Sequence, residues 1–398
     1  MNFNLSPEIE DVRLRIHDFV DEFVLPVERD SSCYNQHENI AAEPLARLRE
    51  KAKSEGLWAI HMPKERGGLG MSIVGMAACY EEMNRSIIGP VCFNAAAPDD
   101  GNMIVLNKVA REDQKQQWLQ PIIDGDVRSA FAMTEPPPGA GSDPFLMKTT
   151  AVKKGDKWII HGHKSFITGA EGAKHFIVIA KTSDDKRRGL TAFLFHSDQP
   201  GWSIKRRIPI MGPEEHGGHC EIIFDGLEIP DENRLMEVGD GLKVTQIRLG
   251  TARLTHCMRW LGLAKRSLSI AVDYAKDRDS FGIKLIDRES VQGLLAEAAM
   301  QIEIGRLLTM KAAFKLDSGS FARKEVSMAK VQVADTLHKA IDTSLQLCGA
   351  YGYSKDTPLE WMYRYARQAR LVDGASEVHR MVMARFLTEE GDNYWNWS

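Results

Sequence analysis

The feature of this sequence that most constrains its fold is a change of pattern that occurs twice along the chain. Apolar residues recur at helical spacing over roughly the first third, beginning with a Ser-Pro-Glu cap at Ser6. From about Phe131, short alternating runs such as KWIIHGHKSFIT and CEIIFDGLEIP, separated by turn residues, predict strands. Long amphipathic helical patterns return after residue 238. The sequence therefore predicts an α+β chain with an all-α domain over 1–130, a β domain over 131–238 and a helical domain over 239–398.

The charge balance and the cysteines limit the classes of function open to this chain. Lys and Arg number 51 and Asp and Glu 55, a net charge of −4, so no global basic field exists to collect nucleic acid or anionic membrane. The six cysteines lack C-x-x-C spacing, which argues against a zinc ribbon or a disulfide scaffold and fits a reducing cytosol. The first residues contain neither a long apolar run nor an Arg-rich, acid-poor transit peptide. We expect a cytoplasmic protein that works on small molecules, without nucleic-acid or membrane partners.

Three familiar catalytic patterns are missing from the sequence. The run Gly139–Gly141 (GAG) lacks the third glycine of a dinucleotide fingerprint and lies outside any βαβ unit, which argues against a Rossmann dehydrogenase. There is no H-E-x-x-H, and the run from His216 to His219 (HGGH) has no carboxylate at ligand spacing, so we predict a substrate-side loop and no metal site. No G-x-S-x-G elbow is present either, which argues against a serine hydrolase.

Two polar segments stand out where the helical and strand-rich parts meet. The run Phe131–Pro136 (FAMTEP), followed by Gly139–Asp143 (GAGSD), offers backbone N–H groups and hydroxyls suited to flavin edges or phosphate oxygens. The run Lys164–Gly169 (KSFITG) ends a strand with an aromatic and a hydroxyl that can flank an isoalloxazine ring. Taken alone, the first segment is equally a proline-rich domain junction and the second merely a strand end.

These segments occur together with two further motifs, Arg278-x-x-Phe281-Gly282 and the run Gln346–Gly352 (QLCGAYG). In order and spacing the four motifs resemble the acyl-CoA dehydrogenase family almost from end to end. Runs such as NAAAPDDGNM and EEHGGHCEIIF look most like a branch with an aspartate base, the dehydrogenase portion of larger multidomain relatives. The resemblance implies a middle β-barrel or sandwich, a C-terminal four-helix bundle, tightly held FAD and a homotetramer built as a pair of dimers.

The residues that the resemblance assigns to FAD fall into two sets. The first lines the flavin, its pyrophosphate and the turn after the base: Phe131, Met133, Thr134, Gly141, Ser142, Phe166, Thr168, Ser376 and Glu377. The second reaches the FAD of a neighbouring subunit: Arg278, Phe281, Gln346 and Gly349. A guanidinium suits a pyrophosphate bidentately, although without the neighbouring motifs Arg278 would be a surface arginine.

The proposed reaction needs a carboxylate that takes the α proton of a thioester while flavin N5 takes hydride from the β carbon. Most of the family places a glutamate before the glycine of Y-E-G-T, and this sequence has the run Val372–Ala375 (VDGA) there, which implies Asp373 as the base. The other family position, before the arginine equivalent to Arg253, holds Ala252, which cannot take a proton. From pattern alone, the Asp-Gly pair is equally a tight turn capping the helix that starts near Ser376.

The expected site around this base follows from the same resemblance. An apolar environment of Val372 and the flavin would raise the pKa of Asp373. The residues assigned to the substrate are Ser142, Arg253 and Gly374. The backbone N–H of Asp373 and a ribityl hydroxyl of FAD would stabilise the enolate oxygen. Arg253 would hold Asp373 or CoA, with an intrahelical ion pair as its alternative role. Because aspartate is shorter than glutamate, an acyl chain that is branched, cyclic or hydroxylated near the reacting carbons fits the site.

Two departures from the family pattern affect the cofactor site. The usual glutamine eight residues after Phe281 is replaced by Glu289, with Gln292 one turn later, and a negative charge there would repel phosphate. Two extra residues between Thr134 and Asp143 would reshape the pyrophosphate loop. We expect rearranged adenosine contacts at the subunit interface.

The leading hypothesis is α,β-dehydrogenation of an acyl-CoA to the trans-2-enoyl-CoA, with electrons passed to an electron-transfer flavoprotein. The alternative enzyme is a flavin oxidase of the nitroalkane-oxidase type, because such relatives also use an aspartate to abstract a carbon-bound proton. A third class, the DNA-associated relatives of this fold, would carry a basic surface, which the charge balance argues against.

Overall fold

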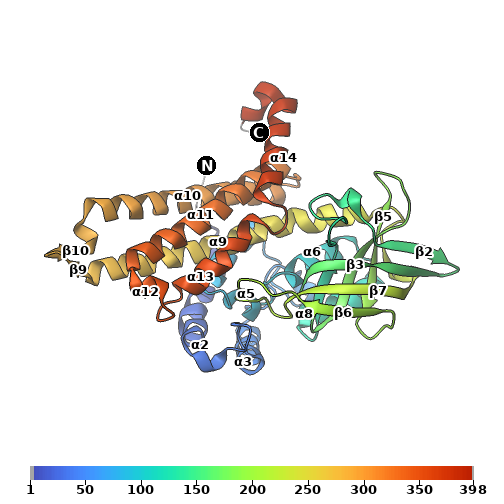
Figure 1. Ribbon diagram of the computed structural model, residues 1–398, viewed down its shortest axis with the longest axis horizontal. Helices are drawn as coiled ribbons and strands as arrows, with labels where there is room; N and C mark the ends of the chain where they lie inside the picture. Colours follow the sequence, from blue (N-terminus) through green and yellow to red (C-terminus); the bar gives the residue numbers. More distant parts are fainter. Residues whose placement is uncertain (1–3, 397–398) are drawn as a thin grey trace.

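Residues 4–396 are described by a computed structural model, in which the chain passes from helices to a β-sheet and back to helices (Figure 1). The predicted order of helical, strand-rich and helical regions is therefore confirmed. The outermost residues of the first and third predicted domains, 1–3 and 397–398, lie outside the described part of the chain.

The N-terminal region is helical and begins as its sequence predicts. Helix α1 has Pro7 in its first turn, and the hydroxyl of Ser6 accepts the backbone N–H of Ile9. The helices of this region are α1 (Pro7–Phe19), α2 (Leu25–Arg29), α3 (Ala42–Ser54), α4 (Ile73–Met83), α5 (Gly89–Cys92), α6 (Asp99–Val109), α7 (Glu112–Gln114) and α8 (Gln120–Asp124). Helix α4 contacts α1 on one side and the C-terminal helices on the other, so it joins the first and third regions.

The middle region is one mixed sheet. Its strands are β1 (Arg128–Ala132), β2 (Thr150–Lys154), β3 (Lys157–Thr168), β4 (Ala173–Lys181), β5 (Leu190–His196), β6 (Trp202–Arg207), β7 (His219–Pro230) and β8 (Arg234–Leu235). The strand order is β6-β7-β3-β2-β4-β5-β8, and β1 pairs parallel with β4. A second core, separate from the helical one, includes the stacked rings of Phe176 and Phe195. Helix α6 is tied to β1, because Asp99 Oδ1 accepts the backbone N–H of Ser129 at 2.7 Å.

The C-terminal region contains the longest helices, α9 (Gly241–Asp277), α10 (Glu289–Asp317), α11 (Arg323–Cys348) and α14 (Ser376–Glu390). Helices α9, α10 and α11 lie side by side, and α14 contacts α11 (Figure 1). Shorter elements complete the region: the hairpin of β9 (Asp279–Ser280) and β10 (Ile283–Lys284), α12 (Ala350–Tyr353) and α13 (Leu359–Ala366).

Helix α9 organises the molecule because it contacts α4, α6, α10 and α11. Its approach to α4 requires glycine at one position, since a Cβ on Gly262 would lie 1.8 Å from the carbonyl oxygen of Glu81. Helix α9 therefore packs closely against α4. Within residues 4–396, no helix combines the length and the apolar character needed to cross a bilayer.

Candidate active site

The turn before α14 holds Asp373 in a backbone conformation that few residues other than glycine adopt. Asp373 has a φ of +50° and Gly374 a φ of +101°, both in the left-handed region. A Cβ on Gly374 would lie 2.9 Å from His379 Nε2, so glycine is needed there for space as well as for φ. The N-cap of α14 is Ala375, so the Asp373 side chain is not the helix cap considered as its alternative role. The turn instead directs this carboxylate toward α9.

Three side chains of α9 converge on Asp373. His256 Nε2 lies 3.2 Å from Asp373 Oδ2, and Arg248 Nη1 lies 3.6 Å from Oδ1. Arg253 Nε donates to the Asp373 backbone carbonyl at 2.8 Å. The carboxylate side chain is 17% exposed, so these contacts are formed largely away from solvent. Arg253 thus holds the turn itself, and an intrahelical ion pair is not its observed contact.

The expected rise in the pKa of Asp373 is wrong. Burial alone would raise the pKa, but the hydrogen bond from His256 and the positive charges of Arg248 and Arg253 outweigh it and lower the pKa far below its ordinary value. The expected environment was Val372 and an apolar ring, with Arg253 nearby, whereas Arg248 and His256 also contact the carboxylate. At neutral pH the group is a carboxylate, the form that can accept a proton.

Arg248 and His256 are site residues that the sequence interpretation missed. The Arg248 guanidinium lies 4.7 Å from the centre of the Phe131 ring, which connects the predicted base to a predicted flavin-lining residue. The signal was present in the helical period, because positions 248, 252 and 256 share one face of a helix. Ala252 occupies the alternative position of the base in the family, and the residues one turn before and after it contact Asp373.

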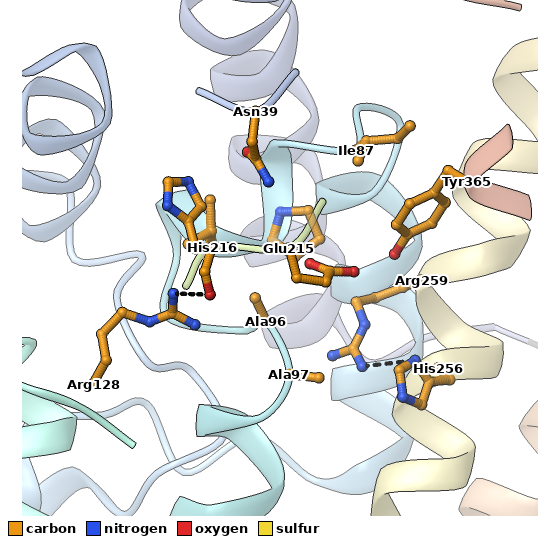
Figure 2. A pocket seen from close by; sticks show the side chains of 12 residues that line it. Asn39, Ile87, Ala96, Ala97, Arg128, Glu215, His216, His256, Arg259 and Tyr365 are labelled. Carbon is orange, nitrogen blue, oxygen red and sulfur yellow. Dashed lines mark hydrogen bonds between the residues drawn. The ribbon is translucent and has the colours of Figure 1, made fainter. Parts of the chain in front are cut away.

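His256 also lines a small cavity. Its volume is about 30 Å³, which is room for about one water molecule. It is lined by side chains from the loop before α6, from the HGGH run and from α9, including Ala96, Ala97, His216 and Arg259 (Figure 2). His216 Nε2 is buried and has no hydrogen-bond partner among the described residues. His216 of the HGGH run thus shares a cavity with His256, the residue that contacts Asp373, and the substrate-side role of the run stays a prediction.

Two segments that carry predicted flavin-lining residues, the loop after β1 and the end of β3, are hydrogen-bonded to each other. Ser165 N–H donates to the Thr134 carbonyl at 2.8 Å, which joins the loop after β1 to β3. Phe166 has a φ of +57° and is 60% exposed, a strained position for a large apolar side chain. Thr168 Oγ1 lies 2.9 Å from His219 Nδ1, so a histidine partner already fixes this hydroxyl. An exposed aromatic ring and, two residues later, an oriented hydroxyl fit a planar heterocycle with polar edges.

A buried ion pair orders the loop after β1. Lys164 Nζ lies 2.9 Å from Glu135 Oε1 and also donates to the Met133 carbonyl. The Glu135 carboxylate further accepts the backbone N–H groups of Lys148 and Thr149 at 2.7 and 2.9 Å. Burial would raise the pKa of Glu135, but the Lys164 charge and these N–H donors lower it to about 2. The pair anchors the start of the loop that carries the predicted residues Gly141 and Ser142, both of which are exposed.

The second predicted set lies far from Asp373. Arg278 follows the end of α9, 25 residues after Arg253, which at the helical rise corresponds to about 37 Å. Phe281, in the hairpin after α9, is 98% exposed, and Gln346 and Gly349 are exposed at the end of α11 (Figure 1). The structure gathers these residues at one end of the bundle and does not bring them to the base of the same chain.

Three remaining expectations concern the turn after Asp373 and the start of α10. Ser376 is fully buried, and its hydroxyl has no hydrogen-bond partner among the described residues, whereas Glu377 is exposed. Glu289 is the exposed first residue of α10, and Gln292 Nε2 donates to the Ile286 carbonyl. No group of three or more His, Cys, Asp or Glu within the described residues is arranged to hold a metal ion.

Family descriptions match nearly the whole chain: "Acyl-CoA dehydrogenase, N-terminal domain" over residues 6–126, "middle domain" over 130–227 and "C-terminal domain" over 239–388. The chain is 37% identical to acyl-CoA dehydrogenase family member 11 of Gallus gallus over 399 residues, covering 96% of this chain and 51% of that protein. It is 36% identical to probable acyl-CoA dehydrogenase FadE2 of Mycobacterium tuberculosis, covering 97% and 96%. The solved structure of a putative acyl-CoA dehydrogenase from Mycobacterium abscessus matches with a TM-score of 0.91 at 35% identity, over 98% of this chain and 100% of that one. The chain thus spans about half the length of several curated relatives.

Proposed function

This chain belongs to the acyl-CoA dehydrogenase family of oxidoreductases, and from that premise we propose that it uses FAD to remove the α and β hydrogens of an acyl-CoA thioester. The product is the trans-2-enoyl-CoA. The observation that carries the proposal is the buried carboxylate of Asp373, directed by a left-handed turn into a site formed by α9. This chain thus uses aspartate as its base.

The residues at the ends of β1 and β3 fit the proposed cofactor. FAD would supply the acceptor for the hydride that leaves the β carbon. Phe131, Phe166 and Thr168 would hold its ring, because two aromatic faces and a hydroxyl meet the needs of a flat ring with polar edges. The ordered loop after Glu135 would bring Gly141 and Ser142 to the pyrophosphate or the thioester.

Asp373 takes the α proton in this proposal. The nearby cations keep the side chain ionised, so it is ready to accept a proton at neutral pH. Arg253 fixes the backbone of the same residue through its carbonyl oxygen. We assign the backbone N–H of Asp373 to the thioester oxygen, where a fixed donor stabilises the charge that develops as the α proton leaves.

Three further parts of the proposal concern the electron acceptor, the compartment and the neighbouring subunits. Electrons pass to an electron-transfer flavoprotein, and the protein acts in the cytoplasm. The exposed set of Arg278, Phe281, Gln346 and Gly349 completes the FAD site of a neighbouring subunit in a homotetramer. These assignments are supported by family membership and by the position of that set at the end of the bundle.

The test is anaerobic reduction of the purified, FAD-loaded protein by a panel of acyl-CoAs that includes straight, branched and hydroxylated chains. We expect one class to bleach the flavin absorbance, with slow reoxidation in air. Rapid peroxide formation with a nitroalkane, without bleaching by any acyl-CoA, would instead support the flavin-oxidase alternative. The Asp373→Asn variant is the control, because it keeps the shape of the side chain and removes the proton acceptor.

A further inference from the structure

The two ring nitrogens of His256 face different partners. Arg259 Nη2 lies 3.3 Å from His256 Nδ1, as the dashed line in Figure 2 marks. A guanidinium can only donate, so Nδ1 must accept and carries no hydrogen. Burial lowers the pKa of His256, and the ring is therefore neutral at pH 7. Its one N–H is then on Nε2, which lies 3.2 Å from Asp373 Oδ2.

Arg259 is itself held in place from two sides. Its Nη1 donates to Asp100 Oδ2 at 2.5 Å and to the Ala95 carbonyl at 2.7 Å, and both charged side chains are almost completely buried. The His256 ring also stacks on Trp260, with ring centres 4.9 Å apart and an angle of 22°. The position and the tautomer of His256 are thus fixed by α6 and α9 and not by solvent.

We propose that His256 is a positioning residue for the base, held as its Nε2–H tautomer by Arg259 and Asp100, so that it occupies Asp373 Oδ2 and leaves Oδ1 to take the α proton. This inference rests on the proposed function, because it assigns the reacting oxygen of that reaction. In the step itself the α C–H bond breaks, an O–H bond forms at Oδ1 and the bonding electrons stay with the substrate. His256 does not take the proton.

The other charged or titratable groups near Asp373 come from three elements and have different partners. On α9, Arg248 lies 3.6 Å from Oδ1 and Arg253 donates to the backbone carbonyl. On α11, Lys330 Nζ donates to the Ala369 carbonyl at 2.8 Å. On α14, His379 Nε2 lies 3.4 Å from the Asp373 carbonyl, and burial lowers the pKa of His379 to about 4. His256 is the group closest to the carboxylate oxygens.

Two substitutions separate the N–H donor from the packing. His256→Phe keeps a ring on Trp260 and removes the donor, whereas His256→Gln places an amide N–H close to the former Nε2. In the Phe variant we expect the rate constant of anaerobic flavin reduction at pH 7 to fall by about tenfold at saturating acyl-CoA, because the carboxylate loses the donor that fixes it relative to the α carbon. The Gln variant should keep a rate constant close to that of the unmodified protein. Equal rate constants for the unmodified protein and His256→Phe would overturn the inference.

A second measurement does not depend on activity. In nitrogen-15 spectra of the histidine-labelled protein, with the His256 signals assigned by their loss in His256→Gln, we expect the neutral Nε2–H form between pH 6 and 8. An Nδ1–H or doubly protonated ring in this range would contradict the proposal.

Failure of the proposed function and failure of the role of His256 give different results. If Asp373→Asn is reduced normally, the proposed function fails, whereas if only the His256 results differ, the proposed function stands without this residue's role.

Discussion

The two ends of helix α9 differ in how complete they are within a single chain. In its first half, Arg248, Arg253 and His256 are turned inward and all contact Asp373, which comes from a segment about 120 residues later in the sequence. Beyond its last residue, Arg278 and Phe281 project from the bundle, and Phe281 is 98% exposed. One helix thus connects a buried site, where its side chains contact Asp373, to an exposed surface at the end of the bundle.

The difference separates two ways in which a sequence motif becomes functional. The base site depends on buried charges that must satisfy one another, because a buried ion without a partner is costly. The far end consists of exposed groups. An exposed aromatic ring next to a cation contributes to binding only when another subunit or a ligand packs on it. Substitutions at the two ends should therefore alter different measured quantities.

The largest expected effect is at the base. Asp373→Asn should lower the rate constant of anaerobic flavin reduction by at least about 10³-fold, because a positioned general base is removed. The flavin spectrum before substrate addition should stay unchanged. Asp225→Asn, at an exposed carboxylate on β7, is the matched control and should retain the rate. Retention of the full rate by Asp373→Asn would remove the central assignment.

Backbone shape gives the next largest effect. Gly374→Ala combines a φ of +101° with a Cβ that would lie 2.9 Å from His379 Nε2, whereas Gly282→Ala, at a φ of +83° beyond α9, would meet nothing within 4 Å. We expect a loss of about 3 kcal/mol of unfolding free energy for the first and about 1 kcal/mol for the second. Thermal unfolding midpoints of the FAD-bound variants provide the comparison. Equal losses would mean that the space around Gly374 does not matter.

The exposed end should respond in cofactor affinity and not in the chemical step. Arg278→Ala should weaken retention of FAD by about tenfold, because a charge-assisted contact to a pyrophosphate is removed. Lys276→Ala, a cation in the last turn of the same helix, is the control and should retain FAD. Ultrafiltration followed by flavin absorbance measures the loss. If both variants retain FAD equally, the exposed set does not serve the cofactor.

The same contrast explains how far the sequence could lead. The order of helical and strand-rich regions and the turn at Asp373 follow from local patterns, because caps, alternation and an Asp-Gly pair act over a few residues. The electrostatic state of Asp373 does not, because it is set by Arg248 and His256, which are distant in sequence and contact the carboxylate only in the folded chain. The expected rise in pKa was wrong for this reason. The helical period places Arg248 and His256 on one face of α9, but it does not determine which segment packs on that face.

The smallest expected effect is on stability and depends on pH. The folded-state pKa of Asp373 is lowered, so its contribution to stability is fully present above the unfolded-state value of about 3.9 and is lost as the pH falls through and below it. At pH 7, Asp373→Asn should therefore be less stable than the unmodified protein by about 1 kcal/mol, because Arg248 and Arg253 lose the negative charge between them. Near pH 3 the two proteins should converge, since the unmodified carboxylate begins to lose its advantage. Unfolding midpoints measured from pH 7 to pH 3 test this, and Asp225→Asn, at an exposed position on β7, should give a small difference at every pH. A gap between Asp373→Asn and the unmodified protein that stays constant or widens toward low pH would mean that the cations of α9 do not stabilise the ionised base, and the two ends of the helix would then differ only in exposure.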